Sequence, residues 1–185
     1  WRTPEKSIGK VQQWHGNAGA VVRAWAFYRR YGRELELMSE HAVLNANYLR
    51  HRILNPDPES RNLDEIHAMP VDGAPADIVK HEFTLSMSPL KDSTGVTGKD
   101  VAKRLLDYGY MSPTLYFPMI VPECLMIEPT ETESREVLDK FANDFLDILG
   151  EDPQIVSTAP HNTDVRRVDE VQAARNLVLR HPCRD

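Results

Sequence analysis

The chain has 185 residues, of which 41% are hydrophobic and 27% are charged, and its formal net charge is −6 at pH 7. This length suits one compact domain with an extension, and the composition is that of a globular rather than a disordered protein. The negative charge excludes general nucleic-acid binding, and no apolar run approaches the roughly 20 residues needed to cross a membrane.

Two helices are predicted near the start of the chain. The first follows Asn17, where apolar residues recur at helical spacing, and it ends at Gly32. The second runs from about Leu35 to Ile53 and has one broad apolar face. Asn45 and Asn47 are expected to weaken this helix, because asparagine is a poor helix former at interior positions.

A loop and a strand are predicted next. Residues 55–77 contain several prolines and are predicted to form a surface loop with at most a short strand. Residues 81–87 alternate between polar and apolar, with Phe83, Leu85 and Met87 on one side. This alternation predicts a half-buried strand.

The middle of the chain predicts one helix and two short extended segments. Thr97 can cap a helix over residues 98–108, and Gly109 ends it. An extended piece is predicted at residues 114–117, and a strand is predicted at residues 124–127.

The last long helix is predicted to begin with a capping box. In this motif the hydroxyl of Thr130 and the carboxylate of Glu133 each accept a hydrogen bond from a backbone N–H. Gly150 closes the helix, and residues 168–179 can hold a short further helix. The apolar stripe of the long helix consists of Val137, Leu138, Phe141, Phe145, Ile148 and Leu149.

This order of elements predicts a small α+β domain, in which helices cover one face of a short, mostly antiparallel sheet. We expect residues 1–34 to form a leading segment with the first helix, residues 35–155 to form the domain, and residues 156–185 to form a C-terminal tail. Because the first residue is Trp rather than Met, the chain is expected to be a piece of a longer protein.

The two cysteines, Cys124 and Cys183, lie too far apart in the sequence for a zinc motif or a redox pair. Cys124 stands in an apolar run and is predicted to be buried, whereas Cys183 is predicted to be exposed. No secretory signal is visible, so a cytoplasmic location is expected. No metal site is predicted, since no histidine stands at ligand spacing from the acidic residues around Glu128.

Several runs of residues, in one order over nearly the whole chain, resemble the C-terminal part of glycine decarboxylase, the pyridoxal-phosphate enzyme of the glycine cleavage system. The ending of the chain is most similar to the second subunit of the two-subunit bacterial form. The runs are Ser7–Val11 with His15-Gly16-Asn17, Ala42–Leu49, Asp100–Gly109, Met126–Glu133 and Thr163–Glu170.

The resemblance implies the small C-terminal domain of a fold-type-I enzyme that uses pyridoxal phosphate (PLP). Such an enzyme decarboxylates glycine and passes the aminomethyl group to the lipoyl arm of the H-protein, and its partner is subunit 1. The family's Schiff-base lysine follows a histidine beside a glycine-rich loop, and none of the chain's seven lysines does so. We therefore expect that this lysine lies outside the chain, that the chain alone binds no PLP, and that it is inactive.

Candidate site residues each have an alternative interpretation. His15, Gly16 and Asn17 precede a helix N-terminus that can hold the cofactor phosphate, although Asn17 can instead be a simple helix cap. His81 and Glu128 are candidates for a substrate channel or a domain interface. They can equally be an exposed strand-end residue and a strand-end acid.

Thr130 is a further candidate for the channel or interface, and its alternative is the capping box described above. Met111-Ser112-Pro113 stands where the family usually has His-Pro-Pro. Two other functions fit the sequence. One is a non-catalytic module that docks subunit 1 or the carrier protein, and the other is the small domain of another fold-type-I enzyme, such as a transaminase.

Overall fold

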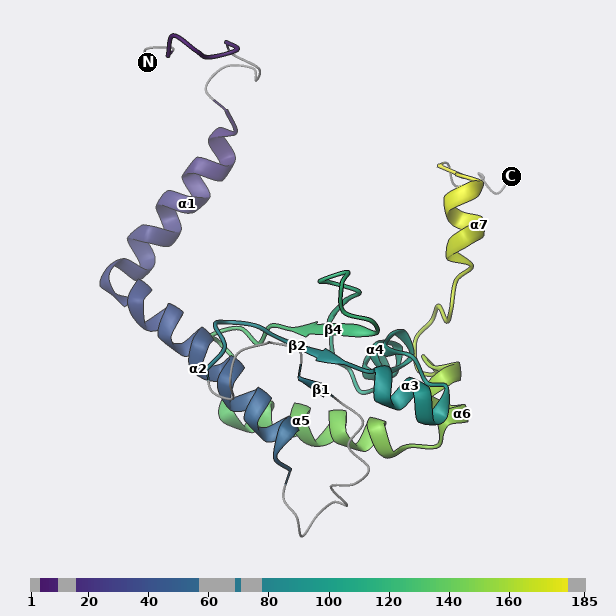
Figure 1. Cartoon of the computed structure of the whole chain (residues 1–185). Coiled ribbons are helices and arrows are strands. Elements are labelled where there is room, and N and C mark those ends of the chain that lie inside the picture. Colours follow the sequence, from purple (N-terminus) through teal and green to yellow (C-terminus); the bar gives the residue numbers. More distant parts are fainter. Residues whose placement is uncertain (1–3, 10–15, 57–68, 71–77, 180–185) are drawn as a thin grey trace. The chain divides into compact units, whose positions relative to one another are not determined.

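The computed structural model describes residues 4–9, 16–56, 69–70 and 78–179 of the chain (Figure 1). The chain divides into two compact units, Trp1–Glu40 and His41–Asp185. Cys183 and His15 lie outside the described residues. In the described part of the chain, no helix is both long enough and apolar enough to span a membrane.

The first unit is dominated by helix α1, Ala18–Tyr31, which confirms the first predicted helix. Asn17 is its N-cap, and the side-chain oxygen accepts a hydrogen bond from the backbone N–H of Ala20 at 3.1 Å. Gly32 ends the helix at a positive φ of 51°, a conformation that glycine adopts without steric cost. A short 3₁₀ helix, η1 (Gly32–Glu34), leads into α2, Leu35–Leu54, as the sequence predicted for the second helix.

The second unit contains an antiparallel sheet with the strand order β1-β2-β4-β3. In the central pair, Leu85 lies opposite Leu125. The predicted antiparallel sheet is therefore confirmed. The strands are β1 (Met69–Pro70), β2 (Phe83–Ser86), β3 (Thr114–Leu115) and β4 (Cys124–Ile127).

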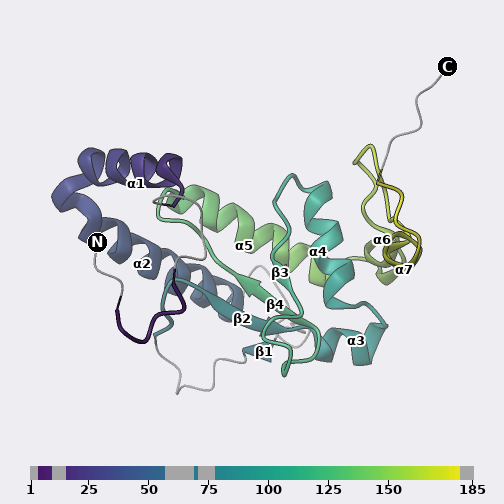
Figure 2. The ribbon, with the colours of Figure 1, turned by 90° about the horizontal axis from the view of Figure 1, so that it is seen from above.

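Helices supply much of the core around this sheet. They are α3 (Ser88–Thr94), α4 (Gly98–Asp107), α5 (Arg135–Gly150) and α6 (Pro153–Thr158), together with the second half of α2. Helices α2 and α5 lie next to each other (Figure 2), and Tyr48 Oη donates a hydrogen bond to Asp139 Oδ1 across them at 2.6 Å. The largest buried side chains include Phe83, Phe145, Ile53, Leu85, Leu105 and Leu125.

The prediction that the β2 segment is half-buried is wrong. Every residue of β2 is buried, including Thr84 and Ser86 on its polar side. Ser86 Oγ donates a hydrogen bond to the carbonyl oxygen of Pro122 at 2.8 Å. The polar side is therefore covered by the chain that connects β3 to β4, and a hydroxyl there is satisfied by backbone rather than by water.

The predicted capping box at Thr130 and Glu133 is also wrong. Helix α5 begins later, at Arg135, and its N-cap is Ser134, whose side chain accepts from the Val137 N–H. Thr130 and Glu133 instead form a turn closed by a backbone hydrogen bond of 3.3 Å. Thr130 and Ser134 each carry a hydroxyl that suits an N-cap, so the preference for such residues at N-caps does not decide between them.

A true capping box lies at the start of α4, where the sequence predicted only the cap. Thr97 Oγ1 accepts a hydrogen bond from the Asp100 N–H at 3.2 Å, and Asp100 Oδ2 accepts from the Thr97 N–H at 2.8 Å. Asp100 also pairs with Arg167, at 2.6 Å between Oδ1 and Nη2. This pair ties the segment before α7 (Glu170–Arg175) to the start of α4.

Two α-helices, α3 and α6, were not predicted from the sequence. Both are single short helices with a proline in the first turn, and neither is long enough to show a clear apolar period. Helix α6 spans the expected start of the C-terminal tail, and Val156, Ala159 and Pro160 are buried. Val156 is therefore part of the core, whereas Thr158 near it is exposed.

The loop between β3 and β4 is held by Glu123, whose side chain is 10% exposed. Its carboxylate accepts hydrogen bonds from Lys91 Nζ and from the Gly98 N–H, and its carbonyl oxygen accepts from the Met87 N–H. Cys124, at the end of the loop, is fully buried as predicted, and its thiol donates to the Phe117 carbonyl at 3.1 Å.

Asn45 and Asn47 have structural roles that explain their presence in α2. Asn45 Nδ2 donates to the carbonyl oxygens of Thr130 at 2.8 Å and Glu133 at 3.2 Å. Asn47 pairs with the backbone of Val79 in both directions, since Nδ2 donates to its carbonyl and Oδ1 accepts from its N–H, each at 2.8 Å. Tertiary hydrogen bonds therefore outweigh the poor helix propensity of asparagine at these positions.

Replacing Asn47 by alanine should lower the free energy of unfolding by about 1–3 kcal/mol, because two backbone groups of Val79 lose their partners. Urea denaturation measures this loss, and hydrogen exchange should show faster exchange of the Val79 amide. Asn55→Ala is the control, because Asn55 is exposed and, among the described residues, its amide donates only to His51 at the same helix end. Equal losses of unfolding free energy for the two variants would contradict a stabilising role of the two Asn47–Val79 hydrogen bonds.

Candidate functional site

A cavity of about 380 Å³ lies in the second unit, where three segments meet. Residues 110–114 form one wall, residues 126–130 form the next, and the start of α5 forms the third. Pairing of β3 with β4 places Thr114 opposite Met126, so two segments that are separate in sequence lie side by side. The apolar lining comes from Leu49, Met126, Ile127, Val137, Leu138 and Phe141, and from Met111 and two prolines.

The polar lining of the cavity is made of hydroxyls and carboxylates. The hydroxyls belong to Tyr110, Ser112, Thr114 and Thr130. Glu128 and Glu133 are the charged residues among the lining side chains that the structure describes. The cavity is thus a mainly apolar hollow with acidic groups from one wall.

Asn45 fixes the part of the lining that carries Glu128 and Glu133, which we call the acidic wall. Its amide donates to the carbonyl oxygens of both Thr130 and Glu133, and Pro129 between the two acids is buried. Because the turn is held from α2 as well as by its own backbone, the carboxylates of Glu128 and Glu133 project from a fixed backbone. Such support is what a binding site needs in order to hold its contacting groups in place.

The structure brings together three of the residues that the sequence singled out. His81 Nε2 lies 3.8 Å from Glu128 Oε1 and 3.9 Å from Glu82 Oε2. Glu128 and Thr130 both line the cavity. The side chains of His81 and Glu128 are 52% and 58% exposed, so the pair lies at the surface beside the cavity rather than in the core.

The other candidates at described positions are Gly16 and Asn17. Gly16 and Asn17 belong to the first unit, where both are exposed, and Asn17 caps α1 as its alternative interpretation predicted. One of the free N–H groups at this helix start is therefore already satisfied by Asn17 itself. A role for these residues in cofactor binding stays a prediction.

Sequence reasoning missed Tyr110, which lines the cavity and is part of a charged network. Its hydroxyl donates to Asp144 Oδ2 at 2.6 Å, and Lys140 Nζ donates to the same hydroxyl at 3.1 Å. Burial and the bond to Asp144 raise the pKa of Tyr110 above its ordinary value, although Lys140 opposes this. The i,i+4 spacing of Lys140 and Asp144 is visible in the sequence, but their meeting with Tyr110 is not.

The lysines and arginines at described positions do not line the cavity. Arg104 instead bridges Glu151, at 2.8 Å, and Asp107, at 3.0 Å, and this pairing raises its already high pKa. Arg167 pairs with Asp100 and donates to the Ala159 carbonyl at 2.6 Å. Both guanidinium groups therefore stabilise the fold from within the chain.

Comparison with known families decides what kind of domain this is. The sequence model described as "Glycine dehydrogenase, C-terminal domain" matches residues 38–168, which include all three walls of the cavity. The chain belongs to this family. The resemblance noted in the sequence is thereby confirmed.

Relatives of this glycine dehydrogenase domain are similar over almost the whole chain. The protein called probable glycine dehydrogenase (decarboxylating) subunit 2 from Alkaliphilus oremlandii (strain OhILAs) is 46% identical over 177 residues, which cover 94% of this chain and 33% of the relative. The proteins of the same name from Thiobacillus denitrificans and Listeria monocytogenes serotype 4a are each 46% identical, over 94% and 95% of this chain and 34% of the relative. The chain spans about a third of the length of these relatives.

The cavity does not fit the phosphate of PLP, the cofactor that the family resemblance implies. A dianionic phosphate is held by cations and by free backbone N–H groups. The charged lining residues at described positions are the carboxylates of Glu128 and Glu133, which would repel it. If this domain contacts the cofactor in a longer protein, the described cavity is not where the phosphate binds.

Proposed function

We propose that this chain is the C-terminal part of subunit 2 of a fold-type-I, PLP-dependent glycine dehydrogenase (decarboxylating). The observation that carries the proposal is 46% identity to relatives of that name over 94% of the chain. The proposed reaction removes CO2 from glycine and transfers the aminomethyl group to the lipoyl arm of the H-protein. Subunit 1 is the proposed partner, and the cytoplasm is the proposed location.

In this proposal the domain supplies a wall of the substrate channel, and the Schiff-base lysine belongs to the part of the relatives that this chain does not span. PLP, when bound there, would withdraw electrons from the carbon that loses CO2. His81, Glu128 and Thr130 are the proposed channel residues, because they gather beside and in the cavity. The apolar face of α5 would keep water out of that channel.

The direct test uses a full-length protein that contains this chain, combined with subunit 1 and lipoylated H-protein. Exchange of labelled bicarbonate into the carboxyl group of glycine is the expected activity. Exchange should depend on both partners. Transamination of a larger amino acid without any exchange on glycine would instead favour another fold-type-I enzyme.

Reduction with borohydride in the presence of PLP should leave the lysines of the 185-residue chain without a stoichiometric adduct. The physical reason is that an activated lysine needs burial or a cationic neighbour, and none of the lysines at described positions is buried. Mass spectrometry of the digested chain measures the result. A full adduct on one lysine, lost when that lysine is replaced by arginine, would place the reactive amine in this chain.

Glu128→Gln in the full-length protein should lower kcat/KM for the exchange reaction about tenfold or more, because a channel carboxylate is lost without a change in shape. The free energy of unfolding should stay within about 0.5 kcal/mol, since the side chain is largely exposed. Glu131→Gln is the matched control, because Glu131 lies on the same turn but does not line the cavity. Equal kinetics for both variants would remove Glu128 from the proposed channel.

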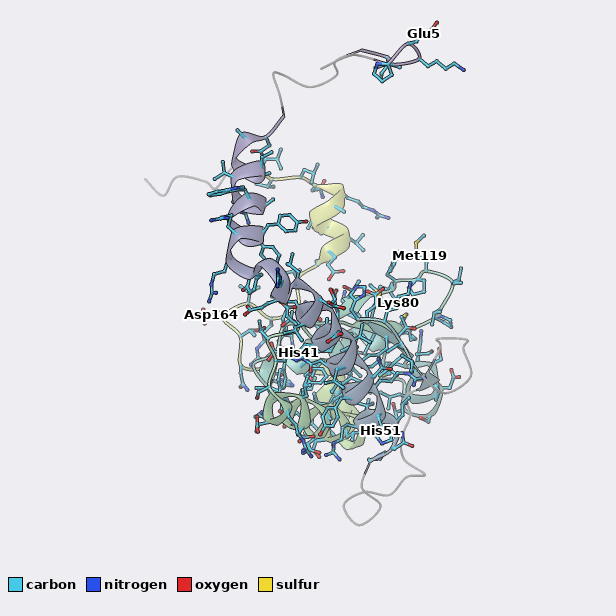
Figure 3. All side chains as sticks on the ribbon, turned by 90° about the vertical axis from the view of Figure 1, so that its left-hand side faces the viewer. Glu5, His41, His51, Lys80, Met119 and Asp164 are labelled. Carbon is cyan, nitrogen blue, oxygen red and sulfur yellow. The ribbon has the colours of Figure 1, made fainter. Side chains whose placement is uncertain are left out.

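A docking module is the second candidate function, and one observation favours it. The β3–β4 loop exposes apolar side chains, with Phe117 56%, Met119 88% and Ile120 91% exposed. Figure 3 shows the Met119 side chain at the outside of the domain. Calorimetry of the chain with subunit 1 or H-protein tests this function. Binding that is lost in a Met119→Ser, Ile120→Ser variant, with no exchange activity in the full-length protein, would favour it.

A further inference from the structure

We infer that the cavity lined by Glu128 and Glu133 binds a primary ammonium group carried on a short apolar stem. This inference rests on the proposed function in one respect, because it concerns the cavity that we propose as part of the substrate channel. It adds the chemical class of the ligand that this cavity binds.

The charge of the lining selects a cation. Glu128 and Glu133 are acidic, and the described lining includes no lysine, arginine or histidine. In the described part of the chain, no hydrogen bond to the Glu133 carboxylate is found, and the imidazole Nε2 of His81, which is not part of the lining, lies 3.8 Å from Glu128 Oε1. An ammonium group has three N–H donors, which two carboxylates and neighbouring hydroxyl oxygens can accept.

The apolar lining of the cavity favours a ligand whose charged group is carried on an alkyl stem. Val137, Leu138 and Phe141 lie along one face of α5 and form one wall of the cavity, and Leu49 joins them from α2. This wall offers no partner to a polar stem, but it would cover a short alkyl chain. A volume of about 380 Å³ is at the small end of ligand sites and suits a compact amine rather than a large cofactor.

Other ligand classes fit less well. A carboxylate or a phosphate would meet like charge at Glu128 and Glu133. A metal ion lacks a ligand set, because the described residues contain no group of three or more side chains that could hold one. A neutral apolar ligand would cover the apolar side chains of α5 but would leave the Glu133 carboxylate without a partner.

The acidic wall is built before any ligand arrives. Asn45 holds the carbonyl oxygens of Thr130 and Glu133, and the hydroxyl of Tyr110, on another wall of the cavity, is held by its bond to Asp144. A ligand therefore meets walls that are already fixed. Little of the binding free energy is then spent on ordering the site.

The test is a titration of the 185-residue chain, followed by NMR of the backbone amides, with n-butylammonium, n-butanol and butyrate as probes. The ammonium is expected to shift the amides of residues 128, 130–133 and 137–141 in a saturable way. It should bind at least about tenfold more tightly than butanol, and butyrate should not bind. Equal affinity for butanol, or no saturable shift with the ammonium, would overturn the inference.

Variants locate the carboxylates that are responsible. Glu128→Gln with Glu133→Gln should weaken butylammonium binding about tenfold or more, whereas Glu131→Gln should leave it within about twofold. Spectra without ligand show whether each variant is folded, and the comparison of probes on the unchanged chain decides the matter if the double variant is not. Unchanged affinity in a folded double variant would also overturn the inference.

The outcome separates this inference from the proposed function. If the chain does not bind butylammonium but the full-length protein exchanges bicarbonate into glycine, the ammonium site is wrong and the proposed function stands. If the amine binds selectively but no exchange is found, the ammonium site stands and the proposed function fails.

Discussion

Replacing Asp107 by alanine is expected to lower the free energy of unfolding by about 3 kcal/mol. Its side chain, at the end of α4, is 1% exposed. The carboxylate accepts hydrogen bonds from the backbone N–H groups of His161, at 2.6 Å, and Asn162, at 2.7 Å, and from Arg104 at 3.0 Å. Alanine would leave the two backbone N–H groups without this acceptor and would release the chain that follows α6, whereas Arg104 would keep its bonds to Glu151.

The loss should depend on pH. Burial acts to raise the pKa of Asp107, but the N–H groups of Asn162 and His161 and the charge of Arg104 outweigh it and hold the pKa below its ordinary value. The folded state therefore binds the proton less readily than the unfolded state does. Stability from Asp107 is present above the ordinary pKa of about 4 and is lost as the pH falls through the lower pKa of the folded state.

Urea denaturation at neutral pH and at about pH 3 measures both effects. The unchanged chain should lose more stability on acidification than the Asp107→Ala variant does. Asp107→Asn is the control, because it keeps one oxygen acceptor and the shape but removes the charge. Its stability at neutral pH should lie between those of the other two proteins, and its loss on acidification should match that of the alanine variant. Parallel losses on acidification in all three proteins would contradict the role of the Asp107 carboxylate.

Replacing Phe145 by alanine is expected to cost about 4 kcal/mol, because the ring is fully buried in the core and its removal leaves a cavity. Phe145 stacks on Phe141, with a distance of 6.1 Å between ring centroids, and Phe141 contacts Tyr110 edge to face. The substitution should therefore also loosen the packing beneath one wall of the ligand cavity.

Val137→Ala is the control for Phe145→Ala. Both residues belong to the apolar stripe predicted from the sequence, but Val137 is 43% exposed. Its replacement should change the free energy of unfolding by about 0.5 kcal/mol or less. Thermal unfolding of the two variants measures the difference, and similar losses would show that the stripe is buried along its whole length.

Local signals predicted the long helices, and competing local signals misplaced one boundary. The apolar period and the glycine stops identify α1, α2, α4 and α5, because a helix repeats its pattern within a few turns. The start of α5 was misplaced because Thr130 and Ser134 both suit an N-cap. The burial of Thr84 and Ser86 could not be predicted, since the cover comes from the chain around Pro122, far along the sequence.

The candidate site shows the same limit. Glu128 and Thr130 were singled out because they stand in a run that resembles a known family, not because the sequence showed a cavity. The cavity arises from the pairing of Thr114 with Met126 and from Asn45, whose partner Thr130 lies 85 residues away in the sequence. Contacts over such separations carry no local pattern, so Tyr110 was missed and Asn45 was interpreted only as a weak point in a helix.

The hydrogen bonds of Glu123 have a consequence for any partner of the β3–β4 loop. One side chain joins this loop to Lys91 and to the start of α4, and the backbone of the same residue holds Met87. The exposed apolar side chains of Phe117 and Met119 are thus presented on a preorganised scaffold. A protein that docks here would give up little entropy in ordering the loop, so even a small contact area could yield a useful affinity.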